Sequence, residues 1–383
     1  MTPGGPPVTL RAIGWDHPRC ARPMTAAAAA WREVTGVAVR WDFRPLTAFN
    51  DQPLEQLARG YDLMVIDHPM IPEAVASGAL RPLADLIDTG VLARLSADAV
   101  GPSGESYHYR GMQWALAVDA ACHVSAGRRR ELQQSAGQPA TWRQALAAVS
   151  RLGHKAALPL MPADAFCALL TIAATLGEPV GLERPVSLRS LELLAELAVK
   201  VHPCSWDCSP PQLLDLMRDG EGIVYVPLIF GYSTYTGPGL CFFDAPASPE
   251  GRRRPVLGGA GLAISSRSDH GEAAADFCTW ICGADAQHDI LLAGGGQPAS
   301  RTIWSPADPA PAGPASDAAE FFAATRASMD SSWVRPQHPR WADFQREGTI
   351  ALAEGLRGGD PPHRIRDRLQ QAASRGTGNR TAA

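Results

Sequence analysis

The chain has 383 residues, of which 45% are hydrophobic and 19% are charged. A chain of this length can bury a substantial core, and the usual size of domains favours two lobes over one. The formal net charge of -4 provides no basic field to hold a polyanion, so nucleic acid is not an expected partner. No apolar run approaches the roughly 20 residues of a membrane-spanning helix, and we expect a chain that does not span a membrane.

The start of the chain and its cysteines indicate in which cellular compartment the protein is expected. Met1 to Pro7 is rich in Pro and Gly and lacks the basic region, apolar core and cleavage site of a secretory signal. As written, the sequence predicts a cytoplasmic protein, and a periplasmic or extracellular one if the start is mis-assigned. The eight cysteines are scattered, mostly in apolar stretches, which favours buried, reduced thiols.

Two cysteine pairs have C-x3-C spacing, Cys204/Cys208 and Cys278/Cys282. The second pair would share one face of a helix. Structural zinc sites more often use tighter spacing, so we expect neither a metal nor a cofactor.

The first third of the chain alternates short β-rich runs with helical stretches. This pattern predicts parallel strands joined by crossover helices, and therefore an α/β fold. Strands are expected at 8–13, 37–43 and 61–66, and helices at 23–35, 52–59 and 72–78. Residues 80–87 contain an apolar-Pro-apolar step, and an irregular stretch is expected from there through 106.

The rest of the chain continues the mixture of strands and helices. Strands are expected at 113–118, 222–226 and 256–265. Amphipathic or apolar patterns predict helices at 141–152 (with Thr141 as N-cap), 165–176, 188–201, 213–219, 272–282, 318–329 and 340–356. Residues 306–314 are expected to form a surface loop, and 373–383 a disordered tail.

Six short stretches occur along the chain in an order that is more informative than any one of them. They are YDLMVID at 61–67 with ALRPLADL at 79–86, ALAVD at 115–119, ATWRQAL at 140–146, the helix and strand at 213–226, GGAGLAI at 258–264 with EAAADF at 272–277, and GGQPASR at 295–301. In this order they resemble motifs of the extracellular solute-binding protein superfamily of ABC importers, in its sugar-binding, maltose-binding-protein-like branch. Ala140 and Gln144 depart from the commonest residues of that pattern.

The resemblance covers about residues 8 to 370 and implies a two-lobed, type II periplasmic-binding-protein-like fold with a hinge between the lobes. Lobe 1 would contain 8–117 and 260–315, and lobe 2 would contain 118–259 and 316–372. The resemblance also implies a function: the lobes clamp a carbohydrate or another hydroxylated small molecule for ABC-type import. The transporter's membrane subunits would then be partners, but fold alone does not establish function.

Ligands of open parallel sheets bind beyond the carboxyl ends of the strands, so the residues that follow each predicted strand are the first candidates. These are Trp15, Asp16 and His17 after the first strand, Arg44 after the second, and Asp67 and His68 after the third. Trp15 could instead be an aromatic at the edge of the core, and Asp16 a helix cap. Arg44 could clamp a carboxylate or form a surface ion pair.

Further candidates come from the later segments: Asp119, Phe230, Tyr232, Gly258, Gly259 and Arg301. Asp119 could accept hydrogen bonds from sugar hydroxyls or be a buried, paired hinge residue. Phe230 and Tyr232 could supply an aromatic platform or only core packing. The two glycines would let backbone approach a ligand or form a bend, and Arg301 has the same alternatives as Arg44.

Two other functions stay open beside import. A cytoplasmic metabolite sensor could use the same closure, and an enzyme could use His17, His68, Asp67 and Asp119 for acid/base chemistry. The sequence has no G-x-S-x-G elbow, no H-E-x-x-H and no dinucleotide G-x-G-x-x-G. We therefore expect a binding protein and not an enzyme.

Overall fold

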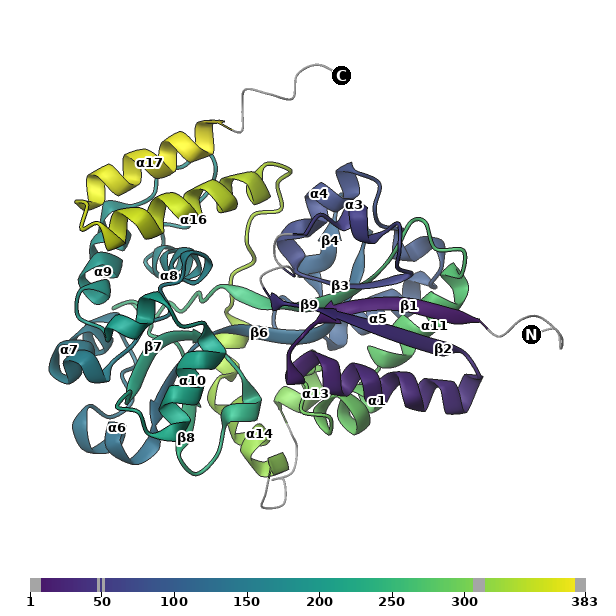
Figure 1. The fold of residues 1–383 in the computed structure, drawn as a ribbon, viewed down its shortest axis with the longest axis horizontal. Coiled ribbons are helices and arrows are strands. Elements are labelled where there is room, and N and C mark those ends of the chain that lie inside the picture. Colours follow the sequence, from purple (N-terminus) through teal and green to yellow (C-terminus); the bar gives the residue numbers. More distant parts are fainter. Residues whose placement is uncertain (1–7, 47–48, 50–51, 306–313, 376–383) are drawn as a thin grey trace. The chain divides into compact units, whose positions relative to one another are not determined.

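The protein is described by a computed structural model that covers residues 8–46, 49, 52–305 and 314–375 (Figure 1). The chain divides into two compact units, each assembled from separate stretches. Unit 1 comprises Met1–Ala120 and Gly258–Ala310, and unit 2 comprises Ala121–Leu257 and Pro311–Ala383. Helices and strands are mixed in both units, which confirms the predicted α/β class.

Unit 1 is built on a sheet with the strand order β2-β1-β3-β9-β6. Its strands are β1 (Thr9–Trp15), β2 (Ala38–Arg44), β3 (Leu63–Ile66), β9 (Leu257–Ile264) and the first part of β6 (Ala115–Arg128). The first three strands are parallel, as predicted, and β9 runs antiparallel to β3 with Ile66 opposite Gly261. The carboxyl ends of three strands therefore meet at one edge.

The helices of unit 1 bury their apolar sides against this sheet. They are α1 (Pro18–Thr35), α3 (Leu54–Leu57), α4 (Ile71–Ala76), α5 (Thr89–Asp98), α11 (Gly271–Ile281), α12 (Ala284–Ala286) and α13 (Arg301–Trp304). Trp31 of α1 and Phe277 of α11 join one buried cluster with Leu10 and Leu262 of the strands. Removing these apolar side chains from water is the main stabilising contribution to unit 1.

Short elements complete unit 1. They are the 3-10 turns η1 (His68–Met70), η2 (Leu83–Asp85) and η3 (Glu105–Tyr107), the hairpin of β4 (His108–Tyr109) and β5 (Met112–Gln113), and the π-helical turn η7 (Gln287–Leu292).

Two expectations for unit 1 are wrong. The helix expected at 52–59 is only one turn, Leu54–Leu57, because Pro53 precedes it and Gly60 follows it closely. The segment expected to be irregular contains α5, whose N-cap Asp88 accepts hydrogen bonds from the amides of Gly90 and Val91 at 2.9 and 3.1 Å.

In unit 2 the second part of β6 lies between two antiparallel partners. These are β7 (Tyr225–Phe230), with His123 opposite Phe230, and β8 (Leu240–Phe243), with Arg128 opposite Leu240. β6 is far longer than the strand expected at 113–118, and its residues stay buried through Gly127 although Asp119, His123 and Ser125 interrupt the apolar run. β7 begins three residues after the expected start at 222, and β8 was not expected.

Helices surround this sheet in unit 2. They are α6 (Arg129–Ser135), α7 (Trp142–Leu152), α8 (Pro162–Thr175), α9 (Leu188–Ala198), α10 (Pro210–Asp219), α14 (Pro314–Ala324), α15 (Arg326–Asp330), α16 (Trp341–Arg357) and α17 (Pro362–Arg375), with the turns η4 (Gly153–Lys155), η5 (Pro203–Trp206) and η6 (Ser233–Tyr235). The predicted N-cap Thr141 is confirmed, since it forms a capping box with Gln144.

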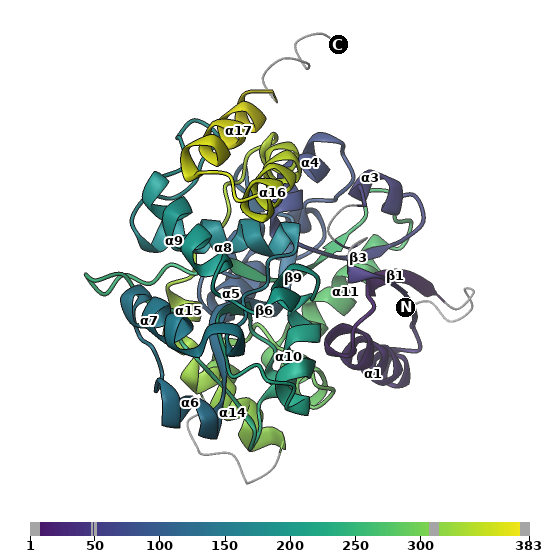
Figure 2. The same cartoon turned by 60° about the vertical axis from the view of Figure 1, so that its left-hand side comes forward.

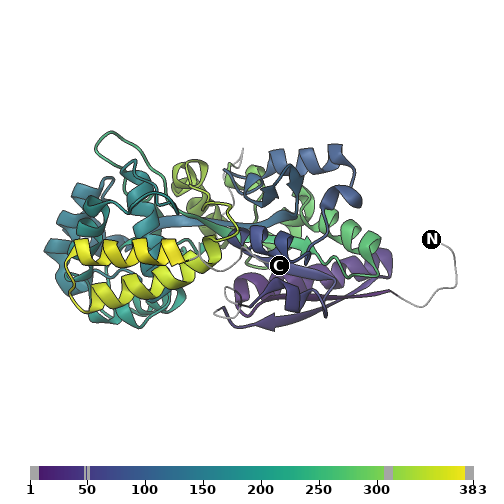
Figure 3. The same cartoon turned by 90° about the horizontal axis from the view of Figure 1, so that it is seen from above.

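The most apolar helix of unit 2, α8, is buried from Ala165 to Thr175. It packs against α9 and α16, and α16 and α17 lie side by side (Figures 2 and 3). A helix that is apolar all round requires such enclosure by its neighbours.

The expected loop and tail fall mostly outside the described residues. Residues 306–313 of the loop and 376–383 of the tail are not described, whereas Pro314 is the first residue of α14. The tail expectation is wrong for its first three positions. Residues 373–375 form the last turn of α17, where Ala373 packs against the core of unit 2.

Candidate functional site

The first group of predicted site residues lies at the carboxyl edge of the unit 1 sheet. Trp15 and Arg44 end neighbouring strands and are paired in register, and the amide of Asp16 donates to the carbonyl of Arg44 at 2.7 Å. Asp67 follows Ile66, the last residue of β3. The structure thus brings the ends of β1, β2 and β3 together, as expected for parallel strands.

Trp15 and Arg44 are both 6% exposed. The Trp15 ring lies 5.3 Å from the ring of Phe49, and the Arg44 guanidinium lies over the same Phe49 ring, also at 5.3 Å. Its Nη1 donates to Oε1 of Gln52 at 3.3 Å. Burial lowers the pKa of Arg44 to about 10, which leaves it cationic at neutral pH.

The helix-cap alternative given for Asp16 is wrong, because the neighbouring residue takes that role. His17, not Asp16, is the N-cap of α1, and its Nδ1 accepts a hydrogen bond from the amide of Arg19 at 3.1 Å. An imidazole nitrogen replaces the usual cap oxygen here, and Pro18 fixes the first helical position. Asp16 is left exposed beside it.

Asp67 and His68 form a pair at the end of β3. The Nδ1 atom of His68 lies 3.2 Å from Oδ1 of Asp67, and His68 is fully buried while Asp67 is 15% exposed. Tyr107 presents its ring edge-on to His68 at 6.3 Å, and its hydroxyl donates to the carbonyl of Ile66 at 3.5 Å. The Asp67 carboxylate, fixed by this packing, can accept hydrogen bonds from a hydroxylated molecule.

Asp119 is buried and paired, which is the second of the two alternatives that the sequence left open for it. Its two oxygens accept hydrogen bonds from Nε and Nη2 of Arg19 at 2.7 and 2.5 Å, and both side chains are 6% exposed. Burial raises the pKa of the Asp119 carboxyl against the opposing effect of Arg19. The pair connects the first turn of α1 to β6.

Gly258 and Gly259 lie near the start of β9, next to β6. Gly259 has φ of 94°, and a Cβ on it would overlap the backbone carbonyl of Asp119. Its lack of a side chain is therefore explained by strand packing.

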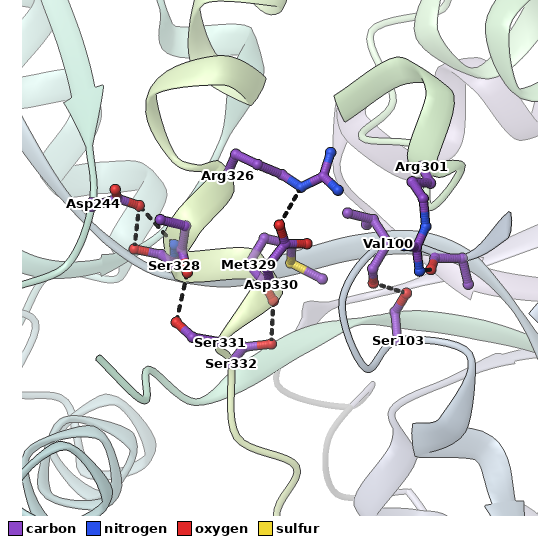
Figure 4. A network of polar contacts seen from close by, with 12 residues as sticks. Val100, Ser103, Asp244, Arg301, Arg326, Ser328, Met329, Asp330, Ser331 and Ser332 are labelled. Atoms are coloured by element: carbon purple, nitrogen blue, oxygen red, sulfur yellow. Dashed lines mark hydrogen bonds and ion pairs between the residues drawn. The ribbon is translucent and has the colours of Figure 1, made fainter. Parts of the chain in front are cut away.

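Arg301 is exposed at the start of α13, and its Nη2 donates to the carbonyl of Ala99 at 3.3 Å (Figure 4). That contact holds α13 against the end of α5. The residue is not at the strand edge that carries Arg44.

The predicted aromatic segment of unit 2 lies at the end of β7. Phe230 packs on the imidazole of His123 at 4.3 Å, and Tyr232 is 7% exposed with its ring perpendicular to Tyr235. The hydroxyl of Tyr235 donates to Oδ1 of Asp215 at 3.1 Å. Burial, with Asp215 beside it, raises the pKa of Tyr235 to about 12, so this hydroxyl remains a neutral donor.

His123 was not among the predicted site residues, although a lone His within an apolar strand was a visible signal. Its Nδ1 lies 2.8 Å from Oγ1 of Thr171, and Thr171 accepts a hydrogen bond from the amide of Val256. Burial, together with the positive charge of Arg335, lowers the pKa of His123 to about 3. The imidazole is therefore neutral.

Two further polar features of unit 2 were missed. Asp164, in the first turn of α8, has a carboxyl whose pKa burial raises to about 7. Asp244, after β8, accepts hydrogen bonds at 2.7 Å from both the amide and the hydroxyl of Ser328, and Arg326 pairs with Asp330 on the same helix (Figure 4). The Asp244–Ser328 contact joins parts of the chain that are 84 positions apart and carries no local motif.

Two hollows in the surface lie away from all predicted site residues. One, of about 390 Å³, lies in unit 1 between Trp31, Val91 and Trp280. The other, of about 460 Å³, lies in unit 2 between the 181–186 loop, Phe344 and Leu369.

Within the described part of the chain, no cluster of three His, Cys, Asp or Glu side chains is placed to hold a metal ion. All eight cysteines are free thiols, and six of them are buried. Across the same described ranges, no helix is both long and apolar enough to cross a membrane.

No protein-family model matches the sequence, and neither does any curated protein. Solved structures do match. A ribitol-bound ABC transporter solute-binding protein of Agrobacterium radiobacter K84 has a TM-score of 0.81 at 19% identity, over 96% of this chain and 98% of that one. The maltose-bound MalE3 of T. maritima gives 0.79 at 14% identity, over 96% and 99%.

A D-mannitol-bound solute-binding protein of Agrobacterium vitis S4 has a TM-score of 0.76 at 18% identity, over 96% of this chain and 98% of that one. The chain has the fold of ABC transporter solute-binding proteins. This confirms, at the level of fold, the two-lobed periplasmic-binding-protein type that the sequence motifs predicted.

Proposed function

We propose that the protein is a solute-binding protein that closes on a small polyhydroxylated ligand, a sugar or a sugar alcohol, for ABC-type import. The observation that carries this proposal is the likeness over nearly the full length of both chains to proteins solved with ribitol, maltose and D-mannitol. A closure of this kind needs differential contacts between ligand and the closed state. The membrane subunits of an ABC transporter would receive the ligand.

We propose the carboxyl edge of the unit 1 sheet as the part of unit 1 that contacts the ligand. Asp16 and Asp67 offer carboxylate oxygens to hydroxyl donors, and the Arg44 guanidinium lies on the neighbouring strand end. Charge-assisted hydrogen bonds are stronger than neutral ones and suit a ligand whose surface is mostly hydroxyl. In unit 2, Phe230 and Tyr232 are the proposed aromatic contacts.

Asp119, Gly259 and Arg301 are weaker candidates for direct contact than the strand-end group. Each has a structural role within unit 1: Asp119 binds Arg19, Gly259 packs against the Asp119 backbone, and Arg301 binds the Ala99 carbonyl. We propose that Asp119 acts by holding α1, whose first turn follows Asp16 and His17.

A thermal-shift screen of the full chain against sugars, sugar alcohols, carboxylates and CoA esters tests the function. A ligand present at 100 times its Kd should add about 2.7 kcal/mol to the free energy of unfolding. A stabilising sugar or sugar alcohol that is recovered unchanged supports the proposal. A hit only among acyl or CoA compounds, or chemical turnover of the hit, would favour the metabolite-sensor or enzyme alternatives instead.

Calorimetric titration of variants with the hit tests the strand-end site. Asp67→Asn should weaken binding by about tenfold or more, because one charge-assisted hydrogen bond is worth roughly 1.5–3 kcal/mol. Asp276→Asn, at an exposed position on α11, is the matched control and should bind as the parent does. Equal affinity of all three proteins would refute the site but not the function.

Uptake of the radiolabelled hit tests the transport role. Deleting the gene should abolish uptake by the source cells, and restoring it should recover uptake. Unchanged uptake in the deletion strain would count against import even if the purified protein binds the ligand.

A further inference from the structure

Two of the eight cysteines differ from the rest in their exposure. Cys204 and Cys208 are partly exposed, whereas the other six are buried. Cys204 lies in the turn η5, and Cys208 lies just before α10. A thiol must be accessible to react with a dissolved reagent, so these two residues are the ones placed for such chemistry.

The two cysteines are also neighbours across one helical turn. The amide of Cys208 donates to the carbonyl of Cys204 at 3.0 Å, which closes one helical turn between them. Residues one helical turn apart lie on the same side of that turn, so a local adjustment of the two side chains can bring the sulfurs to disulfide bonding distance, about 2.0 Å.

The turn that carries the pair is held in place from both sides. The amide of His202 donates to the carbonyl of Ala156 at 2.7 Å, and the carbonyl of Ser205 accepts from the amide of Leu160 at 2.7 Å. Asp207, between the two cysteines, forms an ion pair with Arg357 of α16 at 2.7 Å. These contacts hold the backbone while the thiols react.

We propose that Cys204 and Cys208 form a reversible disulfide by exchange with a small-molecule disulfide such as oxidised glutathione. The Cys208 thiolate attacks one sulfur of the oxidised glutathione and releases one glutathione thiolate. The Cys204 thiolate then attacks the Cys208 sulfur of this mixed disulfide and releases the second. The two protons from the cysteines end on the two glutathione molecules, so one disulfide is consumed as one forms.

The order of attack follows from the environment of Cys204. Burial, with Cys208 beside it, raises the pKa of the Cys204 thiol to about 11, so it supplies little thiolate at neutral pH. Cys208 is therefore assigned the first attack and Cys204 the resolving step.

The chain supplies its own control pair. Cys278 and Cys282 have the same four-residue spacing on α11, but both are buried, and burial raises the pKa of both thiols. A reaction governed by spacing alone would affect both pairs. One governed by access to the thiols would affect only Cys204 and Cys208.

The test equilibrates the full chain with glutathione buffers from fully reduced to fully oxidised, then traps free thiols with an alkylating agent. Intact mass and peptide mapping should show two fewer alkylated thiols per chain in the oxidised buffers, assigned to a Cys204–Cys208 bond. Dithiothreitol should restore both. Cys204→Ser should instead accumulate a glutathione adduct on Cys208, and Cys278→Ser should behave as the parent chain does.

Full alkylation of Cys204 and Cys208 in the most oxidised buffer would overturn the proposal, as would stable glutathione adducts on both residues of the parent chain. Loss of thiols at Cys278 and Cys282 would also overturn it. Circular dichroism of each serine variant verifies that the fold is intact. The outcome is independent of the ligand proposal, because no ligand is used.

Discussion

The Arg19–Asp119 pair is the clearest case in which one buried contact decides local stability. Asp119→Asn would leave the guanidinium of Arg19 buried without its carboxylate, and removing one partner of a buried pair costs about 3–5 kcal/mol. Replacing both, Arg19→Met with Asp119→Leu, should recover most of that loss. Denaturant unfolding of the single and double variants measures both effects, and a loss below about 1 kcal/mol in Asp119→Asn would contradict the expectation.

His123 should make the protein sensitive to acid. Its pKa is lowered from 6.5 to about 3 by burial, so below pH 6.5 the unfolded chain binds a proton that the folded chain does not. The free energy of unfolding should therefore fall as the pH falls, by about 2.3 kcal/mol between pH 6.5 and 4.5 from this group.

His123→Asn should lack this contribution and lose less stability over the same pH range. Urea titrations at pH 7 and pH 4.5 measure the difference between the variant and the parent. His288→Asn, at an exposed position, is the control for the exchange of a histidine for an asparagine. If the free energy of unfolding changed equally with pH in the parent and in His123→Asn, the proposed contribution of His123 would be excluded.

At the scale of single elements, the N-terminus of α7 depends on one side chain. Thr141 Oγ1 accepts a hydrogen bond from the amide of Gln144, and the Gln144 side chain accepts one from the amide of Thr141. Thr141→Ala should lower the free energy of unfolding by about 1 kcal/mol, whereas Thr141→Ser should nearly preserve it. Equal losses in both variants would show that the methyl group, and not the cap, matters.

Elements with local signals could be predicted from the sequence. The end of α1 at Gly36, with φ of 76°, and the cap at Thr141 follow from residues that are adjacent in the chain. The ends of the parallel strands could also be predicted, and with them the grouping of Trp15, Arg44 and Asp67. Their grouping follows from the parallel direction of these strands, which the alternation of strands and helices predicted.

The rest could not be predicted because it depends on distant partners. Arg19 and Asp119 are 100 positions apart, and no local pattern distinguishes a paired carboxylate from one that faces a ligand. His17 is the cap because its imidazole, rather than the neighbouring carboxylate, points at the helix amides. The four residues of β8 are too few to show a period, and their pairing with β6 defines them as a strand.

At the scale of the whole molecule, each unit is assembled from separate stretches of the chain. The sheet of unit 1 needs β9, which lies between β3 and β6, although β9 follows the whole 121–257 stretch of unit 2. The continuous stretch that ends at Ala120 therefore does not complete the core of unit 1 by itself. A fragment that ends at Ala120 lacks β9 and the helix α11 that covers the sheet.

The ends to be joined in a minimal unit 1 lie next to each other, since Gly259 is packed against the backbone of Asp119 and Ala120. A chain of residues 8–120 linked by a short Gly linker to residues 258–305 should therefore fold, because it restores β9 between β3 and β6. It should show a cooperative thermal transition by circular dichroism. Residues 8–120 alone should not, since Leu63 to Ile66 would lose the partner strand that now buries them. A cooperative transition of equal enthalpy in the shorter fragment would mean that β9 is dispensable to the core of unit 1.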